Sequence, residues 1–208
     1  SYGMVELPEG KMKSREGTVV DADDLIQEMF NTAKERTLEK GQIEGLNEEE
    51  LNELYHTIGI GALKFYLLKV DPKKSIMFDP NESIEFQGNT GPFIQYTHAR
   101  SKSILRTLGK STYVSNYTDL NSEELDITQL IYKYNSVISE ASKKMDPAMI
   151  ANYAYELASS FSSFYGKYNL KNETDKDVLN FRLALTEFTA TTIKNAMNLL
   201  GINVPEIM

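Results

Sequence analysis

Apolar residues that recur at helical spacing constrain this chain more than any other feature of its sequence. Between positions 150 and 164 they form one stripe that stays apolar for four turns: Ile150, Tyr153, Ala154, Leu157, Ala158, Phe161 and Phe164. Segment 176–200 is apolar on most of its circumference, which is typical of a helix at the centre of a bundle. The sequence therefore predicts a mainly α fold, a helical bundle without a sheet core.

Capping residues and helix breakers set the expected boundaries of the elements. Asp21 and Asn47 are good N-caps, and Glu50 completes a capping box with Asn47. Gly41 and Gly109 follow helical patterns, as glycine does at helix C-termini. A strand-like run is expected at Tyr2–Leu7, and helices are expected from Asp21 to about Lys40, from Asn47 through Phe65, from Pro92 to Leu108, from about Glu123 to Met145, from Pro147 (with Asp146 as cap) to Tyr165, and from Lys176 to Leu200.

A change in composition near residue 90 predicts two domains, 1–90 and 91–208. Residues 71–91 contain two prolines, two asparagines and two glycines, which indicate an irregular connector with little helix. Residues 1–90 carry 18 acidic and 10 basic side chains, whereas residues 91–208 carry 12 of each. The net charge of −8 argues against a nucleic-acid partner, but the neutral second half repels phosphate less than the first.

Other compositional facts exclude several classes of site and location. The chain has no cysteine, so it has neither disulfides nor thiolate chemistry. Its two histidines, His56 and His98, lie too far apart in sequence to build a zinc cage, and no metal site is expected. There is no apolar run of membrane length and no secretory signal pattern, so a cytoplasmic location without a membrane partner is expected.

A glycine-bounded basic loop near the N-terminus is the first candidate for chemistry. Lys11, Lys13 and Arg15 place three cations within five residues, between Gly10 and Gly17. A mobile cationic loop of this kind suits a polyphosphate, because it can neutralise charge that builds on a leaving pyrophosphate. It is not a phosphate-cradling P-loop, since the required glycines and the Lys-Ser/Thr ending are missing. A solvated surface turn is the alternative interpretation of the same composition.

Five segments, in order, resemble the arginyl-tRNA synthetases, a class I aminoacyl-tRNA synthetase family. The run GNTGP-IQYTHAR and the ending LLGI-VPE-M are long and unusual, and the resemblance covers essentially the whole chain. The segments are GMVELPEGKMKSREGTVVDADDLI around the basic loop, ALKFYLL at 62–68, FQGNTGPFIQYTHARSKSIL at 86–105, ANYAYELASSFSSFYGKY at 151–168, and FRLALTEFTATTIKNAMNLLGINVPEIM at the terminus.

The resemblance implies that the chain is the C-terminal part of a larger enzyme. The family's histidine-isoleucine-glycine-histidine motif and Rossmann domain have no counterpart, and the string His56-Thr57-Ile58-Gly59 is interpreted as accidental. The parent enzyme is expected to activate arginine with ATP and Mg²⁺ and to transfer it to tRNA-Arg, without oligomerising. Residues 1–90 would be the end of the catalytic domain with its stem-contact helices, and 91–208 the anticodon-binding bundle. The fragment is expected to be inactive alone, with no cofactor bound.

The resemblance also assigns roles within the basic loop. Lys11 and Met12 match the first lysine and methionine of the family's lysine-methionine-serine-lysine-serine motif, whereas Lys13, Ser14 and Arg15 depart from it. Lys11, Lys13 and, third, Arg15 are the expected catalytic cations. Lys11, Met12, Lys13 and Ser14 are the expected ATP-binding residues. Which cation replaces the family's second lysine stays open.

Basic residues after Pro92 are candidates for contact with the tRNA backbone. Lys102, Arg106 and Lys110 follow an i, i+4, i+8 spacing, and Arg100 lies nearby. Such a stripe fits a phosphate backbone, but a solvated helix face explains it equally well.

By motif position, four residues are expected to contact anticodon-loop bases: Phe93, Tyr96, Tyr165 and Met208. Tyr165 is preferred because it stands at a helix end before a polar loop, where its ring can face outward. Phe93 replaces the family's usual tyrosine, so stacking is kept and a hydrogen bond is lost.

Several aromatic and charged residues have a structural interpretation instead. Tyr153, Phe161 and Phe164 lie on the apolar stripe and are expected in the core. Arg182 is expected to form a structural ion pair with Glu156 or Asp146 rather than to contact RNA.

Two other functions stay open from the sequence. The chain could be a freestanding synthetase-like module that binds a protein or RNA partner without catalysis. A bundle from another class I synthetase is disfavoured by the GNTGP-IQYTHAR run. RNA binding would weaken steeply with salt, whereas an apolar protein interface would not.

Overall fold

A computed structural model describes residues 3–6, 21–41, 43, 45–113 and 116–208. Helices make up most of these residues, so the mainly α fold expected from the sequence is confirmed. In chain order the elements are β1 (Val5–Glu6), α1 (Ala22–Lys40), α2 (Glu48–Leu68), β2 (Ile76–Met77), α3 (Pro80–Ser83), α4 (Gly91–Leu108), α5 (Ser122–Lys144), α6 (Ala148–Lys167), a short 3₁₀ helix (Leu170–Asn172) and α7 (Lys176–Leu199).

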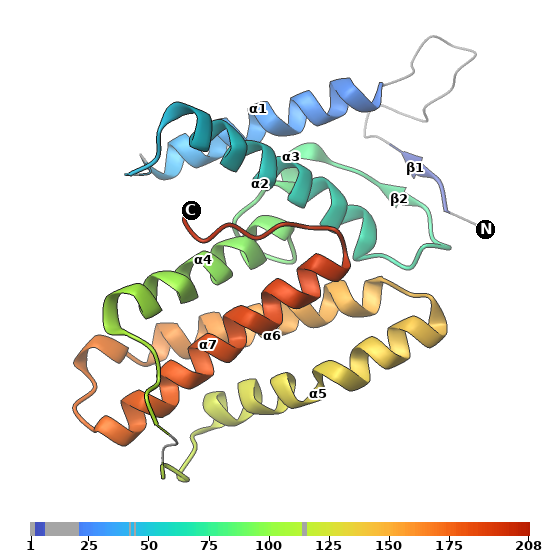
Figure 1. Cartoon of the computed structure of the whole chain (residues 1–208). Coiled ribbons are helices and arrows are strands. Elements are labelled where there is room, and N and C mark those ends of the chain that lie inside the picture. The colour runs from blue at the N-terminus through green and yellow to red at the C-terminus, as the bar shows by residue number, and fades with distance from the viewer. Residues whose placement is uncertain (1–2, 7–20, 42, 44, 114–115) are drawn as a thin grey trace.

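The helices form two layers that share α2 (Figure 1). Helices α4, α5, α6 and α7 pack as a bundle, and α1 and α2 lie above it with α3 and the strands. The bundle core includes Leu157 and Phe161, whereas Met29 and Ile58 belong to a second apolar cluster between α1 and α2. Helix α2 supplies Phe65 to the first cluster as well as residues to the second. The two layers therefore do not have independent cores.

Local capping explains where several helices begin and end, as predicted. The Asp21 side chain accepts from the amide of Asp23 at 3.0 Å. Asn47 and Glu50 form the expected capping box, with hydrogen bonds of 2.8 and 3.0 Å. Gly109 ends α4 with a φ of 89°, which favours glycine. These caps satisfy amide and carbonyl groups that a helix leaves unpaired at its ends.

Other boundaries differ from the prediction by one or two residues. Helix α5 begins at Ser122 because Asn121 caps it. Helix α6 begins at Ala148 after Pro147, so the predicted N-cap is wrong by one position. The Asp146 carboxylate nevertheless accepts from the amide of Ala148 at 3.0 Å.

The connector at 71–91 holds more regular structure than the sequence predicts. It contains the one-turn helix α3 and the strand β2. Strand β2 pairs in parallel with β1, with Val5 opposite Ile76 and Glu6 opposite Met77. This confirms part of the expected strand at 2–7. The pair is too short to supply a sheet core, and the described residues contain no other sheet.

Glycines let α2 approach its neighbours closely. A Cβ atom on Gly91 would lie 2.7 Å from the carbonyl oxygen of Gly61, and one on Gly59 would lie 2.8 Å from that of Met29. Side chains at these positions would therefore force the helices apart.

Candidate functional site

The basic loop at the N-terminus lies outside the described residues. This applies to all five of its predicted functional residues: Lys11, Met12, Lys13, Ser14 and Arg15. Their roles therefore stay predictions. The description resumes at Asp21, the cap of α1.

A pocket of about 690 Å³ opens where α4, the region after α1 and the C-terminal tail meet. Helix α4 supplies one wall and the tail supplies another, while loop residues, Thr37 of α1 and Ser162 of α6 complete the lining. The lining residues are Thr37, Gly41, Ile43, Phe86, Gln87, Phe93, Tyr96, Thr97, Arg100, Ser162, Ile207 and Met208. Three of the four predicted base-contacting residues, from segments more than 100 positions apart, thus share one pocket.

Arg100 joins this pocket to the fourth predicted aromatic residue. Its guanidinium carbon lies 4.5 Å from the ring centroid of Tyr96 and 5.3 Å from that of Tyr165. Both distances are within the range of a cation–π interaction. No carboxylate of a described residue pairs with this guanidinium, so it keeps donors for another partner.

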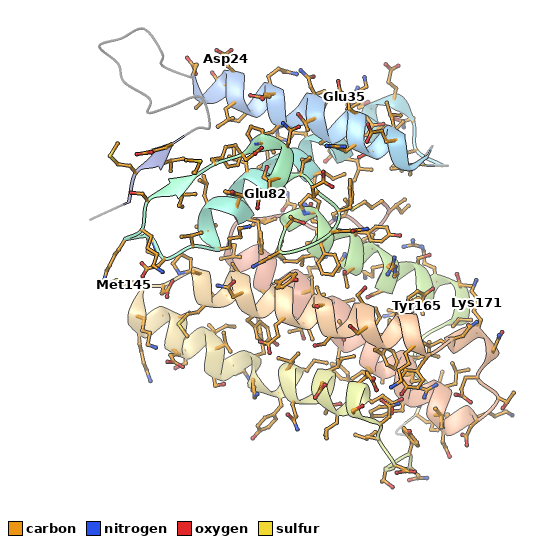
Figure 2. The ribbon with its side chains drawn as sticks, turned by 180° about the vertical axis from the view of Figure 1, so that it is seen from behind. Asp24, Glu35, Glu82, Met145, Tyr165 and Lys171 are labelled. Carbon is orange, nitrogen blue, oxygen red and sulfur yellow. The ribbon has the colours of Figure 1, made fainter. Side chains whose placement is uncertain are left out.

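A second, smaller pocket of about 100 Å³ continues the site past Arg100. Tyr165 and Lys171 line it, together with Asn169. Figure 2 shows Tyr165 and Lys171 at the same end of the bundle, opposite the end that carries Met145. Lys171 is exposed just after α6, and sequence reasoning did not select it.

Phe93 and Met208 form the apolar part of the larger pocket. Both are half-buried, and the Phe93 ring lies 5.7 Å from that of Tyr155. Phe86, which sequence reasoning missed, packs edge-on against Tyr96 at 6.5 Å. The pocket therefore combines aromatic faces, a thioether and one cation.

The prediction of three cations along one face of a single helix is wrong, because Lys110 does not lie on α4. Helix α4 ends at Leu108, and Lys110 beyond it pairs with Glu187 at 2.5 Å. Lys102 and Arg106 do lie on the helix, but both bind the tail, the first at the Glu206 carboxylate and the second at the Glu206 carbonyl, each at 3.1 Å. The Lys102 ammonium lowers the pKa of Glu206. The predicted RNA contacts of Lys102 and Arg106 stay predictions.

Two further α4 residues bind the tail, and sequence reasoning assigned neither a role. Gln95 and His98 are 0% exposed. They contact the carbonyls of Asn203 and Pro205, 108 and 107 positions away. No local pattern in the sequence could have revealed acceptors so distant.

Residues with a structural interpretation behave as predicted, apart from one pair of partners. Tyr153, Phe161 and Phe164 are buried in the bundle core. Arg182 is buried and forms ion pairs, but not with the predicted partners; instead it binds Glu124 at 2.7 Å and Glu173 at 2.8 Å. His56, in the string set aside as accidental, is exposed on α2.

Within the described ranges, no three His, Cys, Asp or Glu side chains gather in a way that could hold a metal ion. None of the described helices combines the length and the apolar character that crossing a bilayer demands.

Comparisons with known proteins identify the family. Residues 94–208 match the DALR anticodon binding domain, which is more than half of the chain, and residues 1–79 match the catalytic domain of class I (R) tRNA synthetases. The chain belongs to the arginyl-tRNA synthetase family. The resemblance inferred from the sequence is thereby confirmed.

The whole length of this chain aligns with individual arginyl-tRNA synthetases. It is 54% identical to the arginine–tRNA ligase of Flavobacterium psychrophilum and 47% identical to that of Phocaeicola vulgatus, covering 35% of each relative. The structure of Thermus thermophilus arginyl-tRNA synthetase superposes with a TM-score of 0.89 at 27% identity, covering 100% of this chain and 35% of that one. The chain thus spans about a third of the length of the relatives it matches.

Proposed function

We propose that this chain reads the anticodon loop of tRNA-Arg as part of an arginine–tRNA ligase. The observation that carries the proposal is the position of the Arg100 guanidinium between the rings of Tyr96 and Tyr165, beside the pocket that holds Met208. Single-stranded RNA loops are bound by stacking splayed bases on aromatic faces and by pairing phosphates with cations. Both kinds of contact are supplied by Arg100, Tyr96, Tyr165 and Met208 together.

We expect the two pockets to contact different nucleotides along the RNA strand. The larger pocket, with Phe93, Tyr96 and Met208, has the apolar walls that a base requires. Arg100 separates it from the smaller pocket, where Tyr165 offers a second ring and Lys171 a second cation. Because the whole chain carries a net charge of −8, affinity must come from this local arrangement.

For the whole enzyme we propose the family's reaction. Arginine is activated by ATP with Mg²⁺, transferred to tRNA-Arg, and AMP and pyrophosphate are released. Residues 1–90 are assigned to the end of the catalytic domain and 91–208 to the anticodon-binding bundle. Lys11, Lys13 and Arg15 would stabilise the phosphates, with Met12 and Ser14 in the same ATP-binding loop.

We further expect this enzyme in the cytoplasm, with no membrane partner and no need to oligomerise. The 208 residues alone should not form arginyl adenylate. Arginine-dependent exchange of pyrophosphate into ATP by this chain would contradict that expectation.

Binding of an RNA hairpin with the sequence of the tRNA-Arg anticodon arm tests the proposal. Replacing Tyr165 with alanine removes a stacking face and should lower affinity by about 1–3 kcal/mol. Tyr132 on α5 is 88% exposed and lies outside both pockets, so Tyr132→Ala is the matched control and should have no effect. Fluorescence anisotropy with a labelled hairpin measures both variants.

Two outcomes would contradict this proposal. One is equal affinity for the hairpin and for the same stem with a scrambled loop. The other is binding that does not weaken as salt rises, which would favour a protein-binding module instead. Under the proposal, Arg100→Gln removes about one phosphate contact. The slope of log K against the logarithm of salt concentration should therefore become shallower by about 1.

A further inference from the structure

The C-terminal tail, residues 201–208, follows α7 and lies along α4 and α2. Figure 1 shows it running back from the end of α7 across α4. Ile202 is buried in the bundle core, which anchors the start of the tail. The Lys64 ammonium of α2 donates to the carbonyl of Gly201 at 2.7 Å. The tail itself has no helix or strand, so its carbonyls accept from side chains or from water rather than from a backbone ladder.

Gln95 and His98 bind the middle of the tail. The Gln95 amide donates to the carbonyl of Asn203, and Nδ1 of His98 meets the carbonyl of Pro205, each at 2.8 Å. Burial lowers the pKa of His98, which favours the neutral ring. A carbonyl only accepts, and the neutral ring therefore carries its proton on Nδ1. Both side chains are fully buried, so losing either bond would leave a polar group without this partner.

Lys102 and Arg106 hold the next part of the tail at Glu206. Together with the two buried donors they follow i, i+3, i+7 and i+11 spacing, which places all four on one face of α4. Tyr96 and Arg100 lie on another face and line the larger pocket. Helix α4 therefore binds the tail on one side and forms the candidate RNA site on the other.

Beyond Glu206, Ile207 and Met208 reach the larger pocket and form part of its wall. We propose that Gln95 and His98 are positioning residues for RNA binding: by holding the tail, they place Met208 opposite Tyr96. This inference rests on the proposed function, because it assigns these residues an effect on the anticodon contact. Neither side chain needs to touch RNA itself.

Two amide substitutions separate positioning from simple packing. His98→Asn keeps an N–H where Nδ1 stands, whereas His98→Gln carries it to the position of Nε2. Affinity for the tRNA-Arg anticodon-arm hairpin should fall about tenfold in the glutamine variant, as for one lost buried hydrogen bond, and by about threefold or less in the asparagine variant. A packing role predicts the reverse order, because glutamine fills more of the histidine volume.

A fluorescence readout follows the tail without RNA. The chain has no tryptophan, and Ile207 is 42% exposed, so Ile207→Trp reports on the end of the tail alone. In that background, His98→Gln should increase acrylamide quenching and shift emission to the red, whereas His98→Asn should not. The control is Lys144→Ala, which removes an exposed ion pair with Glu140 at the end of α5 and should change neither readout.

The outcomes distinguish this inference from the proposed function. If Tyr165→Ala weakens hairpin binding but both His98 variants bind and quench like the parent chain, the positioning role is overturned and the anticodon site stands. If the parent chain does not discriminate the anticodon loop from a scrambled loop, the proposed function fails first. Should His98→Gln not fold, Gln95→Ala removes the other buried donor to the tail, at the Asn203 carbonyl. Unchanged quenching in that variant overturns the inference.

Discussion

At the scale of single residues, the buried ion pair of Arg182 and Glu124 joins α7 to α5. Glu124 is 0% exposed and also accepts from the hydroxyl of Tyr117 at 3.1 Å. Arg182 is 7% exposed, and its second carboxylate partner is Glu173. Removing one partner of a buried ion pair is costly, because the remaining charge stays unpaired in a medium of low dielectric constant.

Arg182→Ala should therefore lower the free energy of unfolding by about 3–5 kcal/mol. The control is Arg36→Ala, because Arg36 bridges Glu39 and Glu85 at the surface and its loss should cost less than about 1 kcal/mol. Urea denaturation followed by circular dichroism compares the two variants. Similar losses in both would show that burial does not strengthen the Arg182 pair.

At the scale of elements, α5 and α6 are joined at one end by an ion pair near the surface. Lys167 donates to Glu123 at 2.6 Å, and the hydroxyl of Tyr168 lies 3.2 Å from the same carboxylate. The Lys167 hydrogen bond is the main reason why the pKa of Glu123 falls from an ordinary 4.5 to about 2. The folded state therefore favours the charged carboxylate more than the unfolded state does.

This shift predicts how stability depends on pH. A carboxyl group with a lowered pKa stabilises the fold above its unfolded value of 4.5, and the contribution is lost as pH falls toward about 2. In the Lys167→Gln variant, stability should fall less between pH 4.5 and about 2 than it does in the unchanged protein, because Glu123 has lost the hydrogen bond that lowers its pKa. Thermal denaturation at a series of pH values measures it, with Lys133→Gln on α5 as a charge-matched control. Parallel curves for the two variants would contradict the assignment.

At the scale of the whole molecule, the contact between α2 and α4 joins the two layers. Gly61 and Gly91 meet there, and Phe65 lies next to them. Phe65 belongs to the bundle core, whereas its helical neighbour Ala62 belongs to the cluster between α1 and α2. Phe65, in the region matched by the catalytic-domain family, shares this core with Ile94, in the region matched by the anticodon-binding family, so the two matched regions pack against one another next to the glycine contact.

Gly91→Ala tests this close approach. The new methyl would lie 2.7 Å from the Gly61 carbonyl oxygen and 3.0 Å from Cβ of Phe65, and should cost about 1–3 kcal/mol of stability. Gly166→Ala is the matched control, because a Cβ at that exposed position of α6 meets nothing within 4 Å. The control should gain up to about 1 kcal/mol from helix propensity. Urea denaturation distinguishes the two, and a neutral Gly91→Ala would show that the helices can separate freely.

Much of the fold could be predicted because its causes are local. An N-cap such as Asp21 or Asn47 acts on amides two or three residues away, and an apolar stripe repeats within one turn. The candidate site was predicted by residue type and motif position, and three of its members do share a pocket. The prediction failed for Lys110 because the i, i+8 spacing was extended past the helix end at Leu108, which the sequence itself had indicated through Gly109.

The sequence by itself determined which segments are helices and which residues belong to the core, because hydrogen bonds and side-chain periodicity act over a few neighbouring positions. Only the tertiary structure decided which face of α4 binds the tail and which forms the pocket. Gln95 meets Asn203, and Arg182 meets Glu124, across separations of 108 and 58 residues. Partners at such distances are set by how the helices pack, and packing depends on all the elements at once.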